Sequence, residues 1–441
     1  MDQPAKSRLE ELNEIANTCV HCGFCLPVCP TYQLWGQEMD SPRGRIDLMK
    51  LSLQGGEVTE AAATHIDRCL GCMACVTACP SGVQYDALLA HARDEVDASA
   101  KRSLPQRLAR WFIFSTFPHP RRLRLLMRPL AVMRRLGVDR WASRSALLSR
   151  FAPRLAAMAS LSPPAAMTRG PAGRYPAQGK RRAVVGMLLG CVQRECFPQV
   201  NDATVRVLNS YGCEVIAPKG QGCCGALSAH SGRSDEARRH AKRMIAAFEA
   251  HDVDAIVVNS AGCGSAMKEY ASLLADDANW CRRAQRCSDR VRDLTQYLAE
   301  LGPTGPRHPV ALTVAYHDAC HLGHAQRLWQ EPRSLLAAVP DLTVREIPNA
   351  GDCCGSAGIY NILEPKTARD LGDRKAAKIA QTDARLLVSA NPGCAMQIAA
   401  AMRRNGSPIP VAHIAEVLDV SIRGGDAAEL LDPQGQRPDS R

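Results

Sequence analysis

The chain has 441 residues, 46% of them hydrophobic, and its 55 Lys and Arg against 44 Asp and Glu give a formal net charge of +11. This length and composition suffice for two or three buried cores and exclude a disordered protein. No apolar run is long enough to cross a bilayer, and the polar start of the chain does not resemble a signal peptide. We therefore expect a cytoplasmic protein that is peripheral at the inner face of the cell membrane.

The chain contains 20 cysteines. Cytosolic thiols stay reduced, so this number does not predict a disulfide framework. Metal binding or redox chemistry is the better interpretation, and the spacing of the cysteines therefore carries most of the functional information.

Two similar cysteine motifs lie near the start of the chain, CVHCGFCLPVCP at residues 19–30 and CLGCMACVTACP at residues 69–80. Each contains Cys-x2-Cys-x2-Cys, which offers three soft thiolates to a [4Fe–4S] cluster, and then a fourth cysteine, followed by proline, that usually binds the neighbouring cluster. The spacing therefore predicts two adjacent clusters with crossed ligation. The predicted ligands are Cys19, Cys22, Cys25 and Cys79 for cluster 1, and Cys69, Cys72, Cys75 and Cys29 for cluster 2.

Zinc sites and inert buried cysteines are the alternative interpretation of these motifs. Structural zinc sites usually separate their two cysteine pairs by a dozen or more residues, and inert cysteines show no regular spacing. The double motif favours iron–sulfur clusters, which have no free iron site for a substrate once all four ligands are thiolates. Single-electron transfer is therefore the predicted chemistry.

Helices are predicted between the two motifs. Ser41 suits a helix N-cap with Pro42 in the first turn, two glycines end that run, and residues 60–69 form a second helical stretch. The sequence thus predicts an α-helical ferredoxin-like domain with two [4Fe–4S] motifs over residues 1–100, rather than the strands of a small bacterial ferredoxin.

A basic amphipathic segment and linker are predicted over residues 101–180. Fourteen Lys and Arg against one acidic residue, Asp139, occupy residues 101–154 and alternate with Leu, Phe and Trp. Such an element suits anionic lipid or an acidic partner. No recognition motif accompanies the charge, so we predict no nucleic-acid partner. The Pro/Gly-rich residues that follow resemble a linker.

An internal repeat fills most of the remaining chain. The stretch AVVGMLLGC…GCCGALSA…NSAGC runs parallel to LTVAYHDAC…DCCGSAG…NPGC, and in both copies apolar strands alternate with helices. This pattern predicts two α/β Cys-Cys-Gly repeat units with largely parallel sheets, at residues 181–300 and 301–425, followed by a flexible tail at residues 426–441. The predicted fold class is therefore multidomain.

Eight cysteines occupy equivalent places in the two repeats, where we expect strands to end. The carboxyl ends of parallel strands commonly build sites, so four thiols per repeat could hold an additional iron–sulfur cluster or zinc; a role in a turn or in packing is the alternative. These candidate metal ligands are Cys191, Cys223, Cys224 and Cys263 in the first repeat, and Cys320, Cys353, Cys354 and Cys394 in the second. We expect ordinary thiols at the four cysteines without a repeat partner, which are Cys196, Cys213, Cys281 and Cys287.

The segment HDACHLGHAQ places three histidines and one aspartate around Cys320. His317, His321 and His324, with Asp318, could bind metal or exchange protons. Capping and packing explain such residues at a strand-to-helix turn at least as well, so both interpretations stay open.

The chain lacks motifs for a cofactor that could supply electrons to the clusters. It has no Gly-x-Gly-x-x-Gly after a strand and no Walker-type phosphate loop, so neither a dinucleotide site nor an ATP site is predicted. An electron relay without its own donor is expected to be one subunit of a larger assembly.

Taken together, these stretches resemble the iron–sulfur subunit of bacterial glycolate oxidase (glycolate dehydrogenase), from CVHCGFCLPVCPTYQL and PRGRIDLMK through HIDRCLGCMACVTACPSGVQYDALL to GCCGALSAH, DCCGSAGIYNI and NPGC. The resemblance implies flavin-containing partner subunits that oxidise glycolate to glyoxylate and pass electrons through this chain to a quinone or another respiratory acceptor. It also implies that the eight N-terminal cysteines bind the clusters, and that this chain has no catalytic residue and does not itself bind glycolate.

Two alternatives and one departure accompany this resemblance. The iron–sulfur subunit of a lactate-oxidising complex has similar motifs, and a redox-sensing iron–sulfur protein is less favoured because all eight ligands are present. The repeats also resemble domains of heterodisulfide reductase that end in Cys-x-x-Cys, whereas Ala266 and Gln397 occupy the last position here. The missing thiol argues against a cluster of the heterodisulfide reductase type.

Overall fold

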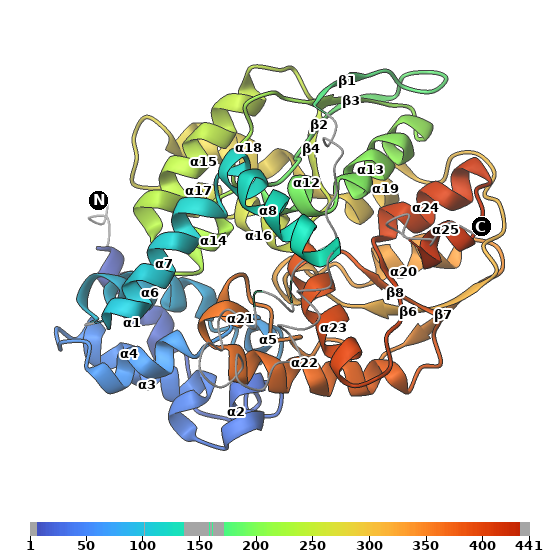
Figure 1. The fold of residues 1–441 in the computed structure, drawn as a ribbon. Helices are drawn as coiled ribbons and strands as arrows, with labels where there is room; N and C mark the ends of the chain where they lie inside the picture. The colour runs from blue at the N-terminus through green and yellow to red at the C-terminus, as the bar shows by residue number, and fades with distance from the viewer. Residues whose placement is uncertain (1–6, 101, 136–157, 159–160, 162–171, 433–441) are drawn as a thin grey trace.

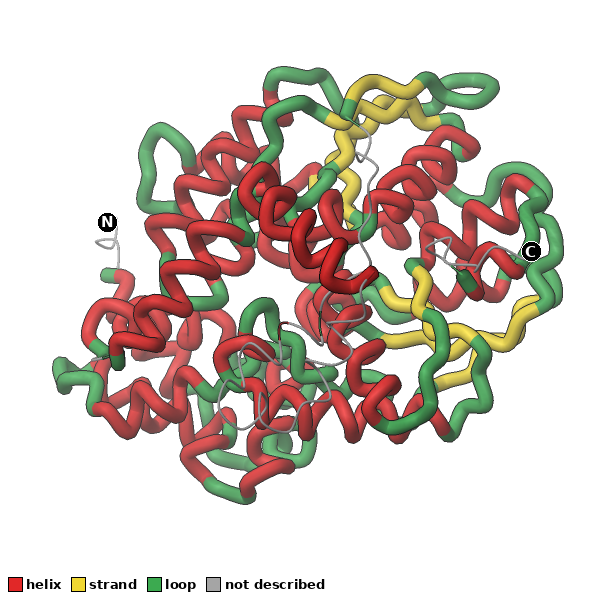
Figure 2. The backbone as a smooth tube through the Cα atoms, viewed as in Figure 1, coloured by secondary structure: helices red, strands yellow, loops and turns green. Residues whose placement is uncertain are grey.

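The computed structural model describes residues 7–100, 102–135, 158, 161 and 172–432 (Figure 1). Most of the predicted basic segment beyond residue 135, and the predicted tail from residue 433, lie outside the described residues. The described chain forms a helical N-terminal region, two connecting helices and two separate sheets covered by helices (Figure 2). No helix in the described ranges is long and apolar enough to span a bilayer.

The N-terminal region is built from helices, and its described residues contain no strand. Helix α3 (Pro42–Leu53) begins as predicted at Ser41, whose Oγ accepts a hydrogen bond from the Gly44 amide at 3.0 Å. A Cβ atom at Gly44 would lie 2.1 Å from the carbonyl oxygen of Glu38, so a larger residue does not fit. The other elements are α1 (Arg8–Asn17), α2 (Pro30–Trp35), η1 (Glu38–Asp40), α4 (Glu60–Asp67), α5 (Ala74–Thr77) and α6 (Tyr85–Ser99). The prediction of helices rather than strands is confirmed.

A small apolar core holds these helices together. Leu12, Ile46 and Leu88, from α1, α3 and α6, are almost completely buried in it. Burial of each such side chain contributes about 1.5–3 kcal/mol. Cys69 belongs to the same core and Cys19 packs against it, so the helices fix the positions of both cysteine loops.

Two helices connect this region to the sheets: α7 (Leu104–Thr116) and α8 (Pro120–Arg135). They run across the first α/β unit (Figure 1). Arg110 on α7 donates to Asp97 at 2.6 Å and to the carbonyl oxygen of Ser231 at 3.0 Å. Arg124 on α8 makes two hydrogen bonds of 2.7 Å with Glu195. The described part of the basic segment is therefore tied to both of its neighbours.

The first sheet has the strand order β1-β3-β2-β4-β5. Strands β2 (Ala183–Met187), β3 (Cys213–Ala217), β4 (Ala255–Val258) and β5 (Val291–Asp293) are parallel, and β1 (Gly173–Tyr175) pairs antiparallel with β3. A strand thus lies within the predicted linker, because edge pairing with β3 extends three residues that carry no apolar pattern of their own. The helices of this unit are α12 (Val192–Cys196), α13 (Pro198–Ser210), α14 (Ala226–Ala229), α15 (Ser234–Glu249), α16 (Ala261–Lys268), α17 (Tyr270–Leu273), α18 (Cys281–Arg290) and α19 (Leu294–Leu301).

The second sheet has the order β7-β6-β8-β9 and all its pairings are parallel. Its strands are β6 (Leu312–His317), β7 (Leu342–Glu346), β8 (Leu386–Ser389) and β9 (Val411–Ala412). Two α/β units with largely parallel sheets were expected and are present. The other elements are the π-helical turn η2 (His321–Ala325), α20 (Gln330–Ala337), α21 (Tyr360–Leu363), α22 (Pro365–Ala380), α23 (Pro392–Arg404), α24 (Ile414–Arg423) and α25 (Ala428–Leu431).

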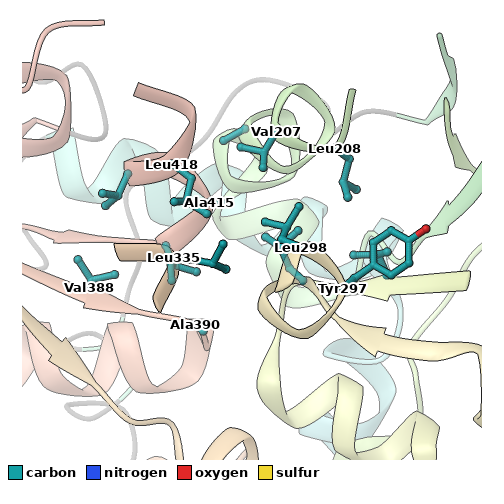
Figure 3. Close-up of a cluster of buried hydrophobic side chains, with 14 of the residues drawn as sticks. Val207, Leu208, Tyr297, Leu298, Leu335, Val388, Ala390, Ala415 and Leu418 are labelled. Carbon is teal, nitrogen blue, oxygen red and sulfur yellow. The ribbon is translucent and has the colours of Figure 1, made fainter. Parts of the chain in front are cut away.

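One apolar core joins the two sheets (Figure 3). Leu208 of α13 and Leu298 of α19 belong to the first unit, and Leu418 of α24 belongs to the second. Helix α24 packs against α13, and Arg206 makes hydrogen bonds of 2.8 and 2.7 Å with Asp419 across this contact. The two repeats therefore pack as one body.

Candidate iron–sulfur and thiolate sites

Two cavities in the N-terminal region bring together the cysteines predicted to bind the two clusters. The first is lined by Cys19, Cys22, Cys25 and Cys79, and also by Cys75. The second is lined by Cys29, Cys69, Cys72 and Cys75. Because Cys75 and Tyr85 line both cavities, the two sites are immediate neighbours. This grouping supports the crossed assignment, although the role of each cysteine as an iron ligand stays a prediction.

The two cysteine loops share one backbone conformation. His21 and Gly23 have φ values of +56° and +86°, and the equivalent Gly71 and Met73 both have a φ of +63°. These left-handed positions curl each loop so that three cysteines face one cavity. For His21 and Met73 this left-handed conformation costs about 1–2 kcal/mol. Strained backbone of this kind is found mostly in functional loops.

The surroundings of Cys69 fit an iron–sulfur cluster. The Gly71 amide donates to Cys69 Sγ at 3.4 Å and the Tyr85 hydroxyl donates to it at 3.6 Å. Hydrogen bonds to the sulfur ligands are one of the ways in which a protein sets the reduction potential of a cluster. Cys22 at the first cavity is exposed, whereas Cys72 at the second is buried, so the first site lies nearer to solvent.

Arg45 is not among the predicted site residues, yet it lines the second cavity and is almost completely buried. Its guanidinium donates to the carbonyl oxygens of Asp40 and His65, each at 2.7 Å. Burial opposes the charge, but Cys69 and other anionic neighbours outweigh it and raise the pKa of Arg45 above its usual value. Arg45 therefore places a fixed positive charge beside the second site. The sequence feature that could have identified Arg45 is a charged residue next to Ile46, on the face of α3 that is buried.

The same charges act on the thiols of the second cavity. Burial works to raise the pKa of Cys69, but Arg45 and Arg93 lower it below the usual thiol range. Burial raises the pKa of Cys72 and Cys75 well above that range. In this cavity Cys69 therefore favours the thiolate form, whereas Cys72 and Cys75 would lose their protons on binding a metal.

The second cavity borders the second α/β unit. Cys72 shares a buried apolar cluster with Cys353, and Cys320 packs against that cluster. Thr77 Oγ1 and His324 Nδ1 are 2.8 Å apart, which links α5 to η2. The thiols of the first repeat belong to a different core cluster. The predicted cluster 2 therefore lies next to the second repeat.

Each repeat gathers its four equivalent cysteines into one hydrogen-bonded set. In the first set, the thiol of Cys223 is hydrogen-bonded to Cys191 and Cys224, and Cys224 is hydrogen-bonded to Cys263. In the second set the order is Cys320, Cys353, Cys354 and Cys394. Hydrogen bonds from the two adjacent thiols hold the pKa of Cys224, and likewise of Cys354, well below the usual range. Each set is thus prepared to present thiolate to a cation.

The expected position of these cysteines at strand ends needs correction. Strand β4 ends at Val258, and Cys263 lies in the first turn of α16. Strand β8 ends at Ser389, and Cys394 lies in the first turn of α23. In the second repeat Pro392 opens the helix, because proline suits the first turn, so the apolar run stops before the thiol is reached.

One local turn recurs at three of the sites. Gly71, Gly225 and Gly355 all have positive φ values, and each amide donates to the Sγ of the cysteine two residues earlier at 3.4 Å. The Cys-Cys-Gly motif thus reproduces the hydrogen bond found at the predicted cluster 2. A backbone amide directed at sulfur suits an anionic, metal-binding thiolate.

The structure separates the histidines of HDACHLGHAQ. His317 ends β6, and its ring lies beside the second thiol set, with donor atoms of His317, Cys354 and Cys394 all within 4.8 Å of one another. His321 Nδ1 is 3.6 Å from Cys320 Sγ. Both histidines thus face thiols.

Asp318 and His324 make contacts that hold neighbouring elements together. Arg333 binds both carboxylate oxygens of Asp318, at 2.9 and 2.7 Å, which removes Asp318 from the set of metal ligands. His324 contacts Thr77 and lies 3.2 Å from the carbonyl oxygen of Gly351. For these two residues the packing interpretation is right.

The four cysteines without a repeat partner lie outside both thiol sets. Burial raises the pKa of Cys196 and Cys287 to about 12 and that of Cys213 to about 11. Cys281 is half-buried, and its thiol is 3.8 Å from the carbonyl oxygen of Ala278. These environments suit ordinary unreactive thiols, as expected.

Three family models match the chain. The model described as a 4Fe-4S dicluster domain matches residues 15–83, and the one described as the linker region of the glycolate oxidase iron–sulfur subunit matches residues 105–162. The cysteine-rich domain model matches twice, at residues 185–268 and 314–399. These matches coincide with the cysteine motifs and with the internal repeat.

Full-length relatives are similar over nearly the whole chain. A probable glycolate oxidase iron–sulfur subunit of Bacillus subtilis is 38% identical over 94% of this chain and 95% of the relative. The glycolate oxidase iron–sulfur subunit of Escherichia coli is 36% identical over 94% of this chain and 96% of its own length. Lactate utilization protein A of an Exiguobacterium strain is 34% identical, but over only 54% of this chain.

Proposed function

This chain belongs to the family of glycolate oxidase iron–sulfur subunits, and from that premise we propose that it relays electrons from flavin-containing subunits, which oxidise glycolate to glyoxylate, to a quinone or another respiratory acceptor. Two [4Fe–4S] clusters would supply the one-electron chemistry. The observation that carries the proposal is the pair of adjacent cysteine-lined cavities that share Cys75 and Tyr85. The chain itself is an electron-transfer subunit and has no predicted site for glycolate.

The surroundings of the two cavities support a direction for the relay. The first cavity is lined by Val20 and Phe24, whose side chains are 68% and 63% exposed. Exposed apolar residues around a redox site suit a partner surface, because contact excludes water and shortens the distance to the donor. The second cavity is lined mostly by buried residues and borders the second repeat. We infer that electrons from the flavin subunits enter at the cavity near Phe24 and leave past Cys72.

A peripheral position at the inner face of the membrane is supported by helix α7. Leu104, Leu108 and Trp111 are 67%, 57% and 67% exposed and lie on one face of the helix, while Ile113 and Phe114 are buried. Arginines of α8 follow directly in the chain. An exposed apolar stripe next to basic residues suits anionic lipid and would bring the relay close to a membrane-dissolved quinone.

The decisive experiment uses the whole complex, purified anaerobically through a tag on this chain. Electron paramagnetic resonance spectra are recorded before and after addition of glycolate, and then of D-lactate. We expect a reduced-cluster signal to develop with glycolate. A response to lactate alone would assign the chain to a lactate-oxidising complex, and a loaded but unresponsive complex would contradict both assignments.

A cysteine variant tests the relay itself. In Cys72→Ser the second cavity loses a predicted ligand, so we expect loss of one cluster signal and of nearly all quinone reduction, while glycolate still reduces the flavin. Cys213→Ser is the matched control, because Cys213 is buried but lies outside all four cysteine groups. Undiminished quinone reduction in Cys72→Ser would rule out the relay.

The Cys-Cys-Gly repeats are further candidates for a cofactor. Their thiol sets are buried, hydrogen-bonded and supplied with amide donors, which suits either an additional iron–sulfur cluster or zinc. The absence of a second cysteine at Ala266 and Gln397 favours a centre with fewer than five thiolates.

A further inference from the structure

We propose that the second Cys-Cys-Gly repeat, but not the first, holds a single tetrahedral metal ion of the zinc class, and that His317 is one of its ligands. The site is separate from the two predicted iron–sulfur clusters. It does not depend on the substrate of the partner subunits.

The first argument is the state of His317 itself. This side chain is 1% exposed, and neither ring nitrogen has an oxygen or nitrogen partner; the ring interacts with the thiol of Cys354. Buried imidazoles normally find a partner, because an unsatisfied buried polar atom destabilises the fold. The donor atoms within reach are the thiols of Cys354 and Cys394. A cation between the ring and these thiols would satisfy all three side chains.

The closeness of the donors indicates one ion rather than a cluster. Zinc binds imidazole nitrogen and thiolate sulfur at about 2.0–2.3 Å, so ligands on one tetrahedron lie about 3.5–4 Å apart. His317, Cys354 and Cys394 already have their donor atoms within 4.8 Å of one another. No other group of three such donors is this close within the described ranges, and that includes the eight N-terminal cysteines. The wider spacing of the N-terminal thiols thus suits a cube, and the closer spacing of these three donors suits a single ion.

A fourth ligand is available from the same hydrogen-bonded set. Cys353 is hydrogen-bonded to Cys354 and Cys320, and Gly355 directs its amide at Cys353 Sγ. The Asn391 side chain donates to Cys394 Sγ at 3.3 Å. One more thiolate from Cys320 or Cys353 completes three sulfurs and one nitrogen, a donor set typical of closed zinc sites.

The charge of such a site is compensated nearby. A divalent cation with three thiolates and one imidazole carries one net negative charge. Lys375 of α22 is 1% exposed, its Nζ donates to the carbonyl oxygen of Ala350 at 2.6 Å, and it lies near enough to Cys354 for their charges to interact. A buried lysine needs an anionic neighbour, and a thiolate-bound ion provides one.

The first repeat provides the internal contrast. Leu188 lies three residues before Cys191, as His317 lies three residues before Cys320, so the two positions are equivalent in the repeats. Leu188 is as buried as His317. His240 lies near enough to Cys224 for their charges to interact, but within the described ranges it forms no group with two thiols whose donor atoms lie within 4.8 Å of one another. The first set therefore has four thiols without an imidazole among them.

The test measures zinc and iron per chain by mass spectrometry in the complex purified anaerobically, after dialysis against a mild chelator. The variants are His317→Leu, which copies Leu188, and Cys354→Ser, with Cys224→Ser of the first repeat as the matched control. We expect about one zinc per chain in the native protein and in Cys224→Ser, and a loss of at least about tenfold in the other two. Iron should stay near eight atoms per chain, about four for each cluster.

Further outcomes decide the assignment even where one variant folds poorly. His317→Cys should retain the zinc, because a thiolate replaces the imidazole, and all variants are accepted only if they keep the iron of the N-terminal clusters. Retention of zinc in His317→Leu would overturn the role of His317. Equal zinc loss in Cys224→Ser and Cys354→Ser would overturn the contrast between the repeats. Iron in place of zinc at this site, or no metal at all, would overturn the zinc assignment.

Discussion

Arg45 is the clearest case of a single side chain that adjusts the chemistry of the predicted cluster 2. It is buried beside Cys69 and keeps its charge because anionic groups surround it. Reduction adds a negative charge to a cluster, and a fixed positive charge nearby favours that step. The buried arginine should therefore raise the reduction potential of the cluster at this cavity.

Arg45→Gln removes the charge and should lower the potential of that cluster by about 60–120 mV, which corresponds to about 1.5–3 kcal/mol for one electron. An anaerobic redox titration followed by electron paramagnetic resonance measures the shift. Arg45→Lys keeps the charge and should lie much closer to the native value. Equal shifts in the two variants would show that packing, rather than charge, is responsible.

At the scale of single elements, helix α24 begins with a buried histidine. His413 Nδ1 accepts from the Ala415 amide at 3.0 Å, and its Nε2 lies 2.8 Å from the carbonyl oxygen of Asn259 in the first repeat. Burial lowers the pKa of His413 to about 4, and burial raises the pKa of Glu416, three residues later, to about 7. The two groups affect stability in opposite directions.

The sign of each effect follows from proton binding. Between about pH 6.5 and pH 4, His413 is protonated in the unfolded chain but stays neutral in the folded protein. The contribution of His413 to the unfolding free energy is therefore fully present above about pH 6.5 and is lost as the pH falls toward 4. Glu416 stabilises the fold at low pH, and its contribution is lost as pH rises through about 7. In the native protein these trends oppose each other across the same range.

His413→Asn separates the two trends, because asparagine can cap the helix without titrating. The native protein should gain about 2 kcal/mol of unfolding free energy over the variant between pH 5 and pH 7. Urea denaturation followed by circular dichroism at several pH values measures this difference. If it stays constant with pH, His413 does not titrate as its burial indicates.

Helix α7 is the second element with a testable property. If its apolar stripe contacts lipid, Leu108→Asp with Trp111→Asp should weaken binding to phosphatidylglycerol vesicles by at least about tenfold, because two apolar side chains no longer enter the interface. Vesicle flotation of the complex provides the measurement. Leu51→Asp on α3 is the control, since Leu51 is 63% exposed but lies outside the stripe. An equal effect of all these substitutions would contradict a specific lipid-binding face.

On the scale of the whole molecule, the two sheets depend on one shared core. Leu418 on α24 is completely buried in the core that contains residues of both units (Figure 3). Leu418→Ala should lower the unfolding free energy by about 2–5 kcal/mol. Because the core is common, we expect both units to unfold in one transition, detectable as equal loss of hydrogen-exchange protection in β2 and β8. Protection lost only in β8 would show that the units unfold independently.

Long-range contacts also decide how the sites are arranged. The thiol sets of the repeats are separated from the N-terminal cysteines by a hundred residues or more of chain, yet Cys353 and Cys72 share one apolar cluster. Among the described residues, the thiols of the first repeat belong to a cluster that contains no N-terminal cysteine. The internal symmetry of the sequence therefore does not extend to the environment of the two thiol sets.

The sequence by itself determined the features that depend on neighbouring residues. Ser41 and Pro42 start a helix, the cysteine spacing curls a loop around a cavity, and the duplicated pattern predicts two parallel α/β units, because capping, turn geometry and apolar periodicity act over a few residues. The crossed grouping of the eight N-terminal cysteines was also predictable, because a general rule links the proline-flanked cysteine to the neighbouring cluster.

Only the tertiary structure decided which side chains meet across the chain. Arg45 lies beside Cys69, and β1 pairs with β3. Cys263 and Cys394 lie in helices rather than at strand ends. Of the three histidines near Cys320, His317 is the one whose donor atoms lie close to two thiols. The physical reason is common to all of these. Burial, charge compensation and packing are set by residues that are distant in sequence, and a local pattern carries no information about them.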